Sequence, residues 1–159
     1  MYYLYEFIVS SIAAIGFALI FQVPKKPLLI SALNAGLGWV IYKMTIAYTG
    51  SVYIGTFLSA FVISFISEFC ARYFKFPALV FIVPGVINLC PGEAIFNTMK
   101  YFINNESALV LLTLSKALAI AGAISFGILL SSSFSRNMKN FRRRKVKRTN
   151  YLNYFRRKK

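Results

Sequence analysis

The chain has 159 residues, of which 58% are hydrophobic, and its net charge is +15 because nineteen Lys and Arg residues face only four acidic ones. Soluble domains have ~45–50% apolar residues, so the composition indicates a membrane protein that crosses the bilayer several times. The chain contains no His and no Asp, which excludes a Ser-His-Asp triad, a Cys-His pair and a His-based metal site within it. We therefore expect no enzyme, no metal site and no cofactor.

Five segments are apolar and long enough, or nearly so, to cross a bilayer, which takes about 20 residues. They are 4–23, 28–47, 51–71, 76–90 and 107–133. We expect an all-α fold, a polytopic membrane helix bundle of about five transmembrane helices in residues 1–133, followed by a basic tail over 134–159. The N-terminus lacks the basic start and the cleavage site of a signal peptide, so the first segment is expected to remain as a span.

The distribution of Lys and Arg predicts the orientation. Residues 136–159 hold twelve of the nineteen basic residues and should stay cytoplasmic under the positive-inside rule. Counting back through five spans places Lys25, Lys26 and Arg72 inside as well, with the N-terminus outside. A four-span alternative, in which 76–103 is re-entrant, disturbs this charge bias, so five spans are favoured. The expected location is the plasma membrane.

Two polar features stand out in the second and third segments. Asn34 lies in an apolar helix, where its amide is expected to form an interhelical hydrogen bond rather than bind a ligand. Glu68 precedes Arg72 by four residues, which places both on one helical face as an ion pair at the inner end of the third span. The alternative is that Glu68 is a cytoplasmic gate or a proton-coupling site, because intramembrane carboxylates are costly and usually face a cavity.

The fourth segment is interrupted twice, by Pro84-Gly85 and by Pro91-Gly92. Proline removes a backbone donor and glycine loosens the chain, so a straight helix is not expected there. At membrane depth an irregular backbone is tolerated mainly where it is covered by protein or lines a cavity, and transporters place such breaks at their substrate sites. We expect one half-helix to end near Val83 and another to begin at Pro91.

Candidate binding groups gather around this break. If Pro91 is the first helical residue, the backbone N–H groups that follow, beginning with that of Gly92, favour an anion such as a substrate carboxylate. Glu93 either caps the helix or pairs with a substrate ammonium or a coupling proton. The expected substrate-binding residues are Pro84, Gly85, Asn88, Pro91, Gly92, Glu93, Asn97 and Lys116, and the candidates for gating or proton coupling are Glu68 and Glu93.

The fifth segment carries one charge, Lys116, about two turns from its start. Its side chain either extends to the lipid headgroups or faces the bundle, where it would bind a carboxylate. Ala119, Ala123 and Gly127 repeat every four residues, which predicts close packing against another helix. The basic tail that follows is expected to anchor the topology by lying on anionic lipid of the inner leaflet. RNA binding by the tail is the weaker alternative, so we expect no nucleic acid.

Two stretches resemble a known family. The run PALVFIVPGVINLCPG at 77–92 is similar to the P-A-L-V-F-x-V-P-G-I-I-P-L-V-P-G signature of the threonine/serine exporter family. The run LNAGLGWVIY at 33–42 resembles the Gly-x-x-Gly-Trp-x-x-Tyr segment of that family's second span. The resemblance covers roughly residues 10–133. Asn88 stands where the family usually has proline, and Cys90 stands where it usually has a small aliphatic residue.

The resemblance implies the small membrane subunit of a split exporter that works with a larger membrane subunit as a hetero-oligomer. It implies export of small amino acids, threonine and serine, and we add proton coupling as a hypothesis because a few membrane carboxylates are present. Two alternatives stay open. One is an exporter of a small organic or dicarboxylic acid on the same scaffold, and the other is a non-transporting membrane organiser that recruits lipid or a cytosolic partner through its basic tail.

Overall fold

The computed structural model describes the backbone of residues 1–156 and, beyond Ser135, the side chain of Asn137 alone. Its elements in chain order are α1 (Tyr2–Ile20), α2 (Lys25–Thr49), α3 (Val52–Phe74), α4 (Leu79–Val86), the short 3-10 helix η1 (Ile87–Leu89), α5 (Gly92–Ile103) and α6 (Ser107–Arg156). The predicted all-α membrane fold is confirmed, and the described residues contain no strand. Four helices are long and apolar enough to cross a membrane, and the bent pair α4–η1 and α5 would make a fifth.

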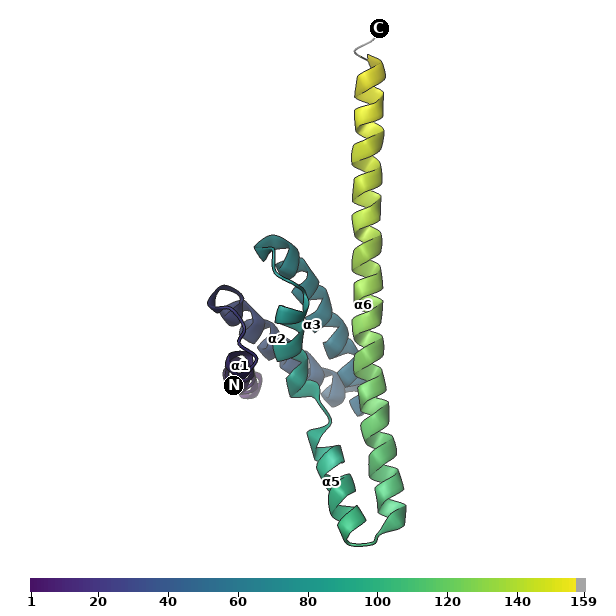
Figure 1. Ribbon diagram of the computed structural model, residues 1–159. Helices are drawn as coiled ribbons and strands as arrows, with labels where there is room; N and C mark the ends of the chain where they lie inside the picture. The colour runs from purple at the N-terminus through teal and green to yellow at the C-terminus, as the bar shows by residue number, and fades with distance from the viewer. Residues whose placement is uncertain (157–159) are drawn as a thin grey trace.

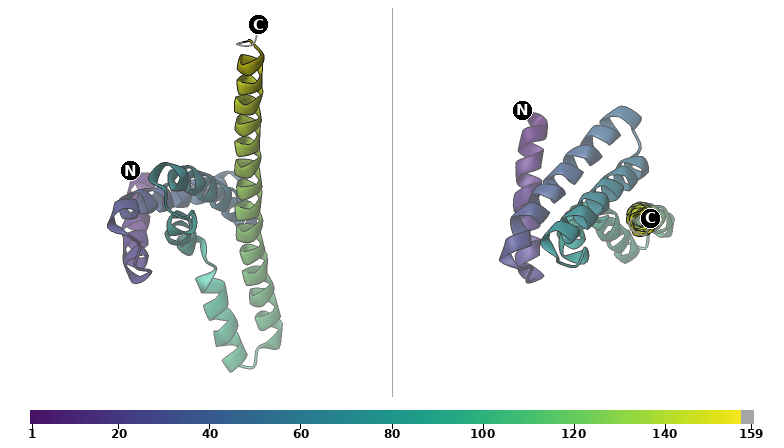
Figure 2. Two further views of the ribbon diagram at one scale, coloured as in Figure 1. Left: turned by 45° about the horizontal axis from the view of Figure 1, so that its top comes forward. Right: turned by 90° about the horizontal axis from the view of Figure 1, so that it is seen from above.

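The helices form a layer that a single long helix crosses. α1, α2 and α3 lie next to one another, and the view from above shows α6 end-on beside them (Figure 2). α4 packs on α2 and α3, whereas α5 packs on α6 and projects with it beyond the layer (Figure 1). α6 continues without a break into the segment predicted as the basic tail (Figure 1).

α3 and α6 run in the same direction. A Cβ atom at Gly127 of α6 would lie 2.8 Å from the carbonyl oxygen of Phe57, near the start of α3. Further along both helices, the Arg72 guanidinium donates to the Ser135 carbonyl oxygen at 3.1 Å. The contacting residue numbers rise together, so the two helices cross obliquely in the same sense rather than antiparallel (Figure 2), and the chain returns between them through α4 and α5. The close packing predicted at Gly127 is confirmed.

Buried polar side chains connect the helices of the layer. The Asn34 amide of α2 donates to the Ile63 carbonyl oxygen at 3.1 Å and to the Ser67 hydroxyl at 2.9 Å, both on α3. The Ser59 hydroxyl donates to the Gly38 carbonyl oxygen at 2.5 Å. In lipid such interhelical bonds are worth about 0.6–2 kcal/mol each. The interhelical role predicted for Asn34 is therefore confirmed.

The break in the fourth segment falls later than the sequence predicted. α4 passes through Pro84 and ends at Val86, three residues after the expected end at Val83. α5 begins at Gly92 rather than at Pro91, because the ψ of 52° at Pro91 is not helical. The two limbs, Leu79–Leu89 and Gly92–Ile103, are bent by 51° relative to each other.

A hydroxyl on α2 explains why the helix continues through Pro84. Proline has no N–H, so the carbonyl oxygen of Val80 loses its helical donor four residues on. The single hydroxyl proton of Ser31, which is fully buried, is shared between the Pro27 carbonyl oxygen at 2.9 Å and the Val80 carbonyl oxygen at 3.4 Å. A neighbouring helix thus supplies a weak substitute for the missing bond, and the backbone leaves the helical conformation only at Cys90 and Pro91.

Candidate functional site

A cavity of about 270 Å³ lies beside the break, where it meets α2, the start of α3 and α6. Its walls include five of the eight predicted binding residues, namely Asn88, Pro91, Gly92, Glu93 and Lys116. These residues come from η1, the break, α5 and α6, so a single cavity collects groups up to 28 positions apart in the chain. The break therefore borders on a space that a small ligand can enter.

The other three predicted residues lie outside this cavity wall. Pro84 and Gly85 are buried, and a Cβ atom at Gly85 would come within 2.6 Å of the Ile63 side chain. Glycine at this position lets α4 approach α3 closely, which is a packing role. Asn97 is half-buried on α5 but does not line the cavity.

Asn88 fastens the break to α1. Its amide nitrogen donates to the Ser10 carbonyl oxygen at 3.1 Å and to the Ser10 hydroxyl at 2.7 Å. The Ser10 hydroxyl in turn donates to the Ala35 carbonyl oxygen of α2 at 3.5 Å. Asn88 thus ties three helices together while also lining the cavity, and this connection fixes the position of η1.

The start of α5 presents backbone donors at the cavity. The N–H of Gly92 donates to the Cys90 carbonyl oxygen at 2.8 Å, so it is not available in the way the sequence suggested. The N–H of Ile95 donates to the Pro91 carbonyl oxygen at 3.0 Å. Within the described residues the N–H groups of Glu93 and Ala94 have no acceptor. An anion at this helix start would be bound by those two groups and favoured by the helix dipole.

Two opposite charges face the same space. Glu93 and Lys116 both line the cavity and both are exposed. The ion pairs among the described residues are formed by other side chains, Glu6 with Lys43 and Glu68 with Arg72. The carboxylate of Glu93 and the ammonium of Lys116 therefore remain open to a ligand.

Two aromatic residues of α2 complete the wall, and sequence reasoning did not identify them as site residues. Trp39 and Tyr42 have ring centroids 5.2 Å apart and planes tilted by 31°. The Trp39 indole N–H donates to the Glu6 carboxylate at 2.6 Å, and the Lys43 ammonium lies 3.3 Å from the same carboxylate. The Gly-Trp-x-x-Tyr stretch could have predicted that both rings lie on one side of α2, because residues three apart share a helical face.

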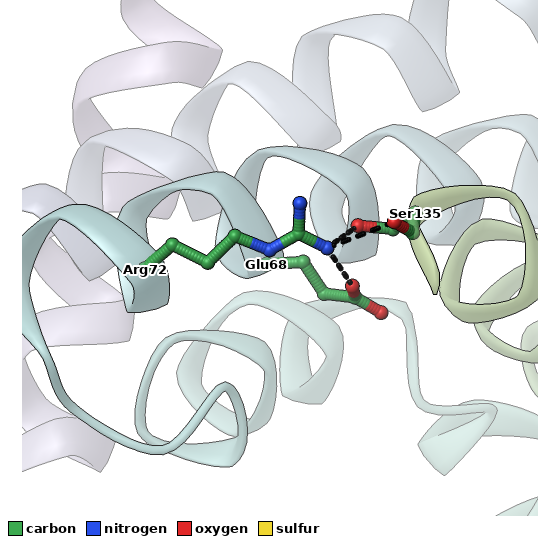
Figure 3. A network of polar contacts seen from close by, with 3 residues as sticks. All are labelled: Glu68, Arg72 and Ser135. Carbon is green, nitrogen blue, oxygen red and sulfur yellow. Dashed lines mark hydrogen bonds and ion pairs between the residues drawn. The ribbon is translucent and has the colours of Figure 1, made fainter. Parts of the chain in front are cut away.

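The ionic pair of the third segment lies at a different cavity, of about 520 Å³, between the end of α3, the start of α4 and α6. Arg72 Nη2 donates to Glu68 Oε2 at 3.3 Å and also contacts both oxygens of Ser135 (Figure 3). The predicted ion pair is confirmed. The proposed gating role of Glu68 stays a prediction.

Comparisons with known proteins point to one family. A family model described as "Threonine/Serine exporter, ThrE" matches residues 6–134. A Corynebacterium glutamicum protein named "Threonine/serine exporter" is 25% identical over 132 residues, which is 83% of this chain and 27% of that protein. An "Uncharacterized protein" of Haemophilus influenzae is 33% identical over 97 residues, which is 60% of this chain and 32% of its own length.

These relatives are much longer proteins, since the chain spans about a third of their length or less. No solved structure matches the chain.

Proposed function

The chain belongs to the threonine/serine exporter family, and from that premise we propose that it is a membrane subunit exporting small amino acids, threonine and serine, across the plasma membrane. Family membership supports transport. The observation that carries the rest is the cavity at the α4–α5 break, because it joins an irregular backbone to groups of both charges. Transporters bind their substrates at such interruptions of a helix.

The groups around this cavity suit a zwitterion. The substrate carboxylate would accept hydrogen bonds from the N–H groups at the start of α5 and pair with Lys116. The substrate ammonium would pair with Glu93 and lie near the faces of Trp39 and Tyr42. A dicarboxylate would place a second anion beside Glu93, so the charges of this wall favour an amino acid over a diacid.

Three further parts of the proposal concern the whole assembly. The chain crosses the membrane five times with its basic C-terminal segment inside on anionic lipid, and the parallel packing of α3 and α6 supports this count. It works with a larger membrane subunit, which the greater length of its relatives supports. Export is coupled to protons, with Glu93 and Glu68 as the carboxylates proposed to carry them.

The test is efflux of labelled threonine and serine from cells that carry the chain and its larger partner, with Gly92→Leu as the variant. A Cβ atom at Gly92 meets no atom within 4 Å and Gly92 lines the cavity, so we expect leucine there to narrow the cavity without displacing the backbone. Gly16→Leu is the matched control, since Gly16 on α1 has equally open surroundings and lies outside the cavity wall.

We expect Gly92→Leu to lower efflux about tenfold or more, which corresponds to about 1.4 kcal/mol of lost binding, and Gly16→Leu to leave it unchanged. Equal efflux by both variants, at equal amounts of inserted protein, would remove the break from the transport path. Absence of threonine and serine efflux from the unaltered complex would contradict the substrate and favour an organic acid.

A further inference from the structure

A second cavity lies at the opposite end of α4 from the break. Its volume is about 520 Å³, and its wall includes Glu68 and Arg72 of α3, Ile82 of α4 and Ser132 of α6. The break cavity begins at Asn88, just past the other end of α4. α4 with η1 therefore separates two cavities, both of which also contact α6.

The second cavity contains an oriented pair of opposite charges. Glu68 and Arg72 lie 3.3 Å apart, and their side chains are 13% and 43% exposed. The contacts that the described residues make to the guanidinium all go through Nη2, two of them from Ser135 of α6 (Figure 3). A guanidinium has five N–H donors, so further donors remain for a ligand.

We propose that this cavity is a second binding site for the zwitterionic head of an α-amino acid. Arg72 takes the carboxylate through paired N–H groups, as guanidinium groups do, and Glu68 takes the ammonium. The inference rests on the proposed function, because it assigns the same substrate class to both ends of α4. The substrate then occupies one cavity before and the other after passing along α4.

The charges define what this site rejects. A dicarboxylate meets repulsion from Glu68, and a simple amine meets repulsion from Arg72. A ligand that carries both charges replaces the direct contact of Glu68 with Arg72 by two contacts of its own. If the ion pair only pins α3 to α6, the cavity binds none of these compounds, and this difference can be measured.

The experiment uses Ser132→Cys as a reporter in the full chain with its partner, in membrane vesicles, with Cys70 and Cys90 replaced by serine. We expect threonine to slow the reaction of the new thiol with a small thiol reagent several-fold, and acetate, ethylamine and malonate to have no effect. Arg72→Gln removes this protection. Lys75→Asn keeps it, because Lys75 is exposed, lies outside the cavity wall and has a left-handed φ of 58° that asparagine tolerates.

Arg72→Lys tests whether the effect of Arg72→Gln comes from misfolding. Lysine keeps the positive charge beside Glu68 but lacks the paired N–H donors of arginine. We expect it to give weaker protection than arginine and stronger protection than Arg72→Gln. Equal reaction rates with and without threonine, protection by malonate in place of threonine, or full protection in Arg72→Gln would each overturn the second site.

The reporter also separates this inference from the exporter proposal. Efflux of threonine without protection of the thiol rejects the second site and leaves the exporter proposal intact. Protection without any efflux keeps the binding site and rejects export as its use.

Discussion

Trp39 connects the wall of the break cavity to charges on α1. The Trp39 side chain is half-buried, and the Glu6 carboxylate accepts a hydrogen bond from its indole N–H at 2.6 Å. Glu6 is balanced by Lys43, whose ammonium lies 5.3 Å from the Trp39 ring centroid. Each of the three side chains is held by the other two, so the aromatic face toward the cavity is fixed before any ligand arrives. The cost of ordering this wall is thereby met in folding rather than in binding.

Glu93 can be tested through its neighbour Cys90, an exposed thiol in the same cavity wall. In a Cys70→Ser background we expect threonine to slow the reaction of Cys90 with a thiol reagent several-fold. Glu93→Gln removes the partner of the substrate ammonium. The apparent affinity of threonine, measured from the protection of Cys90, should therefore fall about tenfold, which corresponds to about 1.4 kcal/mol. The measurement is the labelling rate against threonine concentration.

Glu106→Gln is the control for that experiment, because Glu106 is exposed before the start of α6 and does not line the cavity. We expect threonine to protect Cys90 in the Glu106→Gln variant as strongly as it does in the chain with both glutamates intact. Equal protection in Glu93→Gln and Glu106→Gln would mean that Glu93 acts only on α5, through its negative charge at the helix start.

The polar contacts of a residue could be predicted from the sequence where its partner lies within the same helix. They could not be predicted where the partner lies on another helix. The spacing of Glu68 and Arg72 gave their ion pair, but no local pattern connects Arg72 to Ser135, 63 positions later. Pro84-Gly85 looks like Pro91-Gly92 in sequence. In the structure, Gly85 packs closely against Ile63, so the first pair has a packing role. The second pair, Pro91-Gly92, lines the cavity.

At the scale of elements, the position of the break depends on α2. Proline alone predicts a disruption near Pro84, because the chain cannot supply the missing N–H. The Ser31 hydroxyl supplies a donor to the Val80 carbonyl oxygen from outside the helix. The existence of a broken span could therefore be predicted from its prolines and glycines, whereas its location required knowing which helix packs beside it.

This explanation predicts a specific coupling between Ser31 and Pro84. Ser31→Ala should lower the free energy of unfolding by about 1 kcal/mol, since a buried carbonyl loses its donor. In a Pro84→Ala background the restored N–H satisfies Val80, and the same change should cost about 0.5–1 kcal/mol less. Unfolding of the purified protein in detergent, measured for the four variants, gives the coupling energy.

Ser64→Ala is the matched control, because the Ser64 hydroxyl is also fully buried but has no hydrogen-bond partner among the described residues. Its effect should be the same in the Pro84 and Pro84→Ala backgrounds. Additive effects of Ser31→Ala and Pro84→Ala would show that the hydroxyl does not replace the proline N–H.

At the scale of the whole molecule, the direction of α6 supports the proposed five crossings over the four-span alternative. If residues 76–103 were re-entrant, α3 would end on the side of the membrane where α6 begins, and the two helices would be antiparallel. Contacts of Gly127 with Phe57, and of Ser135 with Arg72, run in the parallel sense. The charge bias of the sequence favours the same five crossings for an independent reason.

The two topologies differ in the sides on which two turns lie. With five crossings the turn before α2 and the turn between α5 and α6 are on opposite sides, whereas with four crossings they share one side. We therefore expect Lys26→Cys and Asn104→Cys, each in a chain with Cys70 and Cys90 replaced by serine, to react with an impermeant thiol reagent from opposite faces. The reagent should label Asn104→Cys in intact cells and Lys26→Cys only in opened cells.

Ser51→Cys, at the turn between α2 and α3, is the control, and we expect the reagent to label it from the same side as Asn104→Cys. Labelling of Lys26→Cys and Asn104→Cys from the same face would exclude the five-crossing topology.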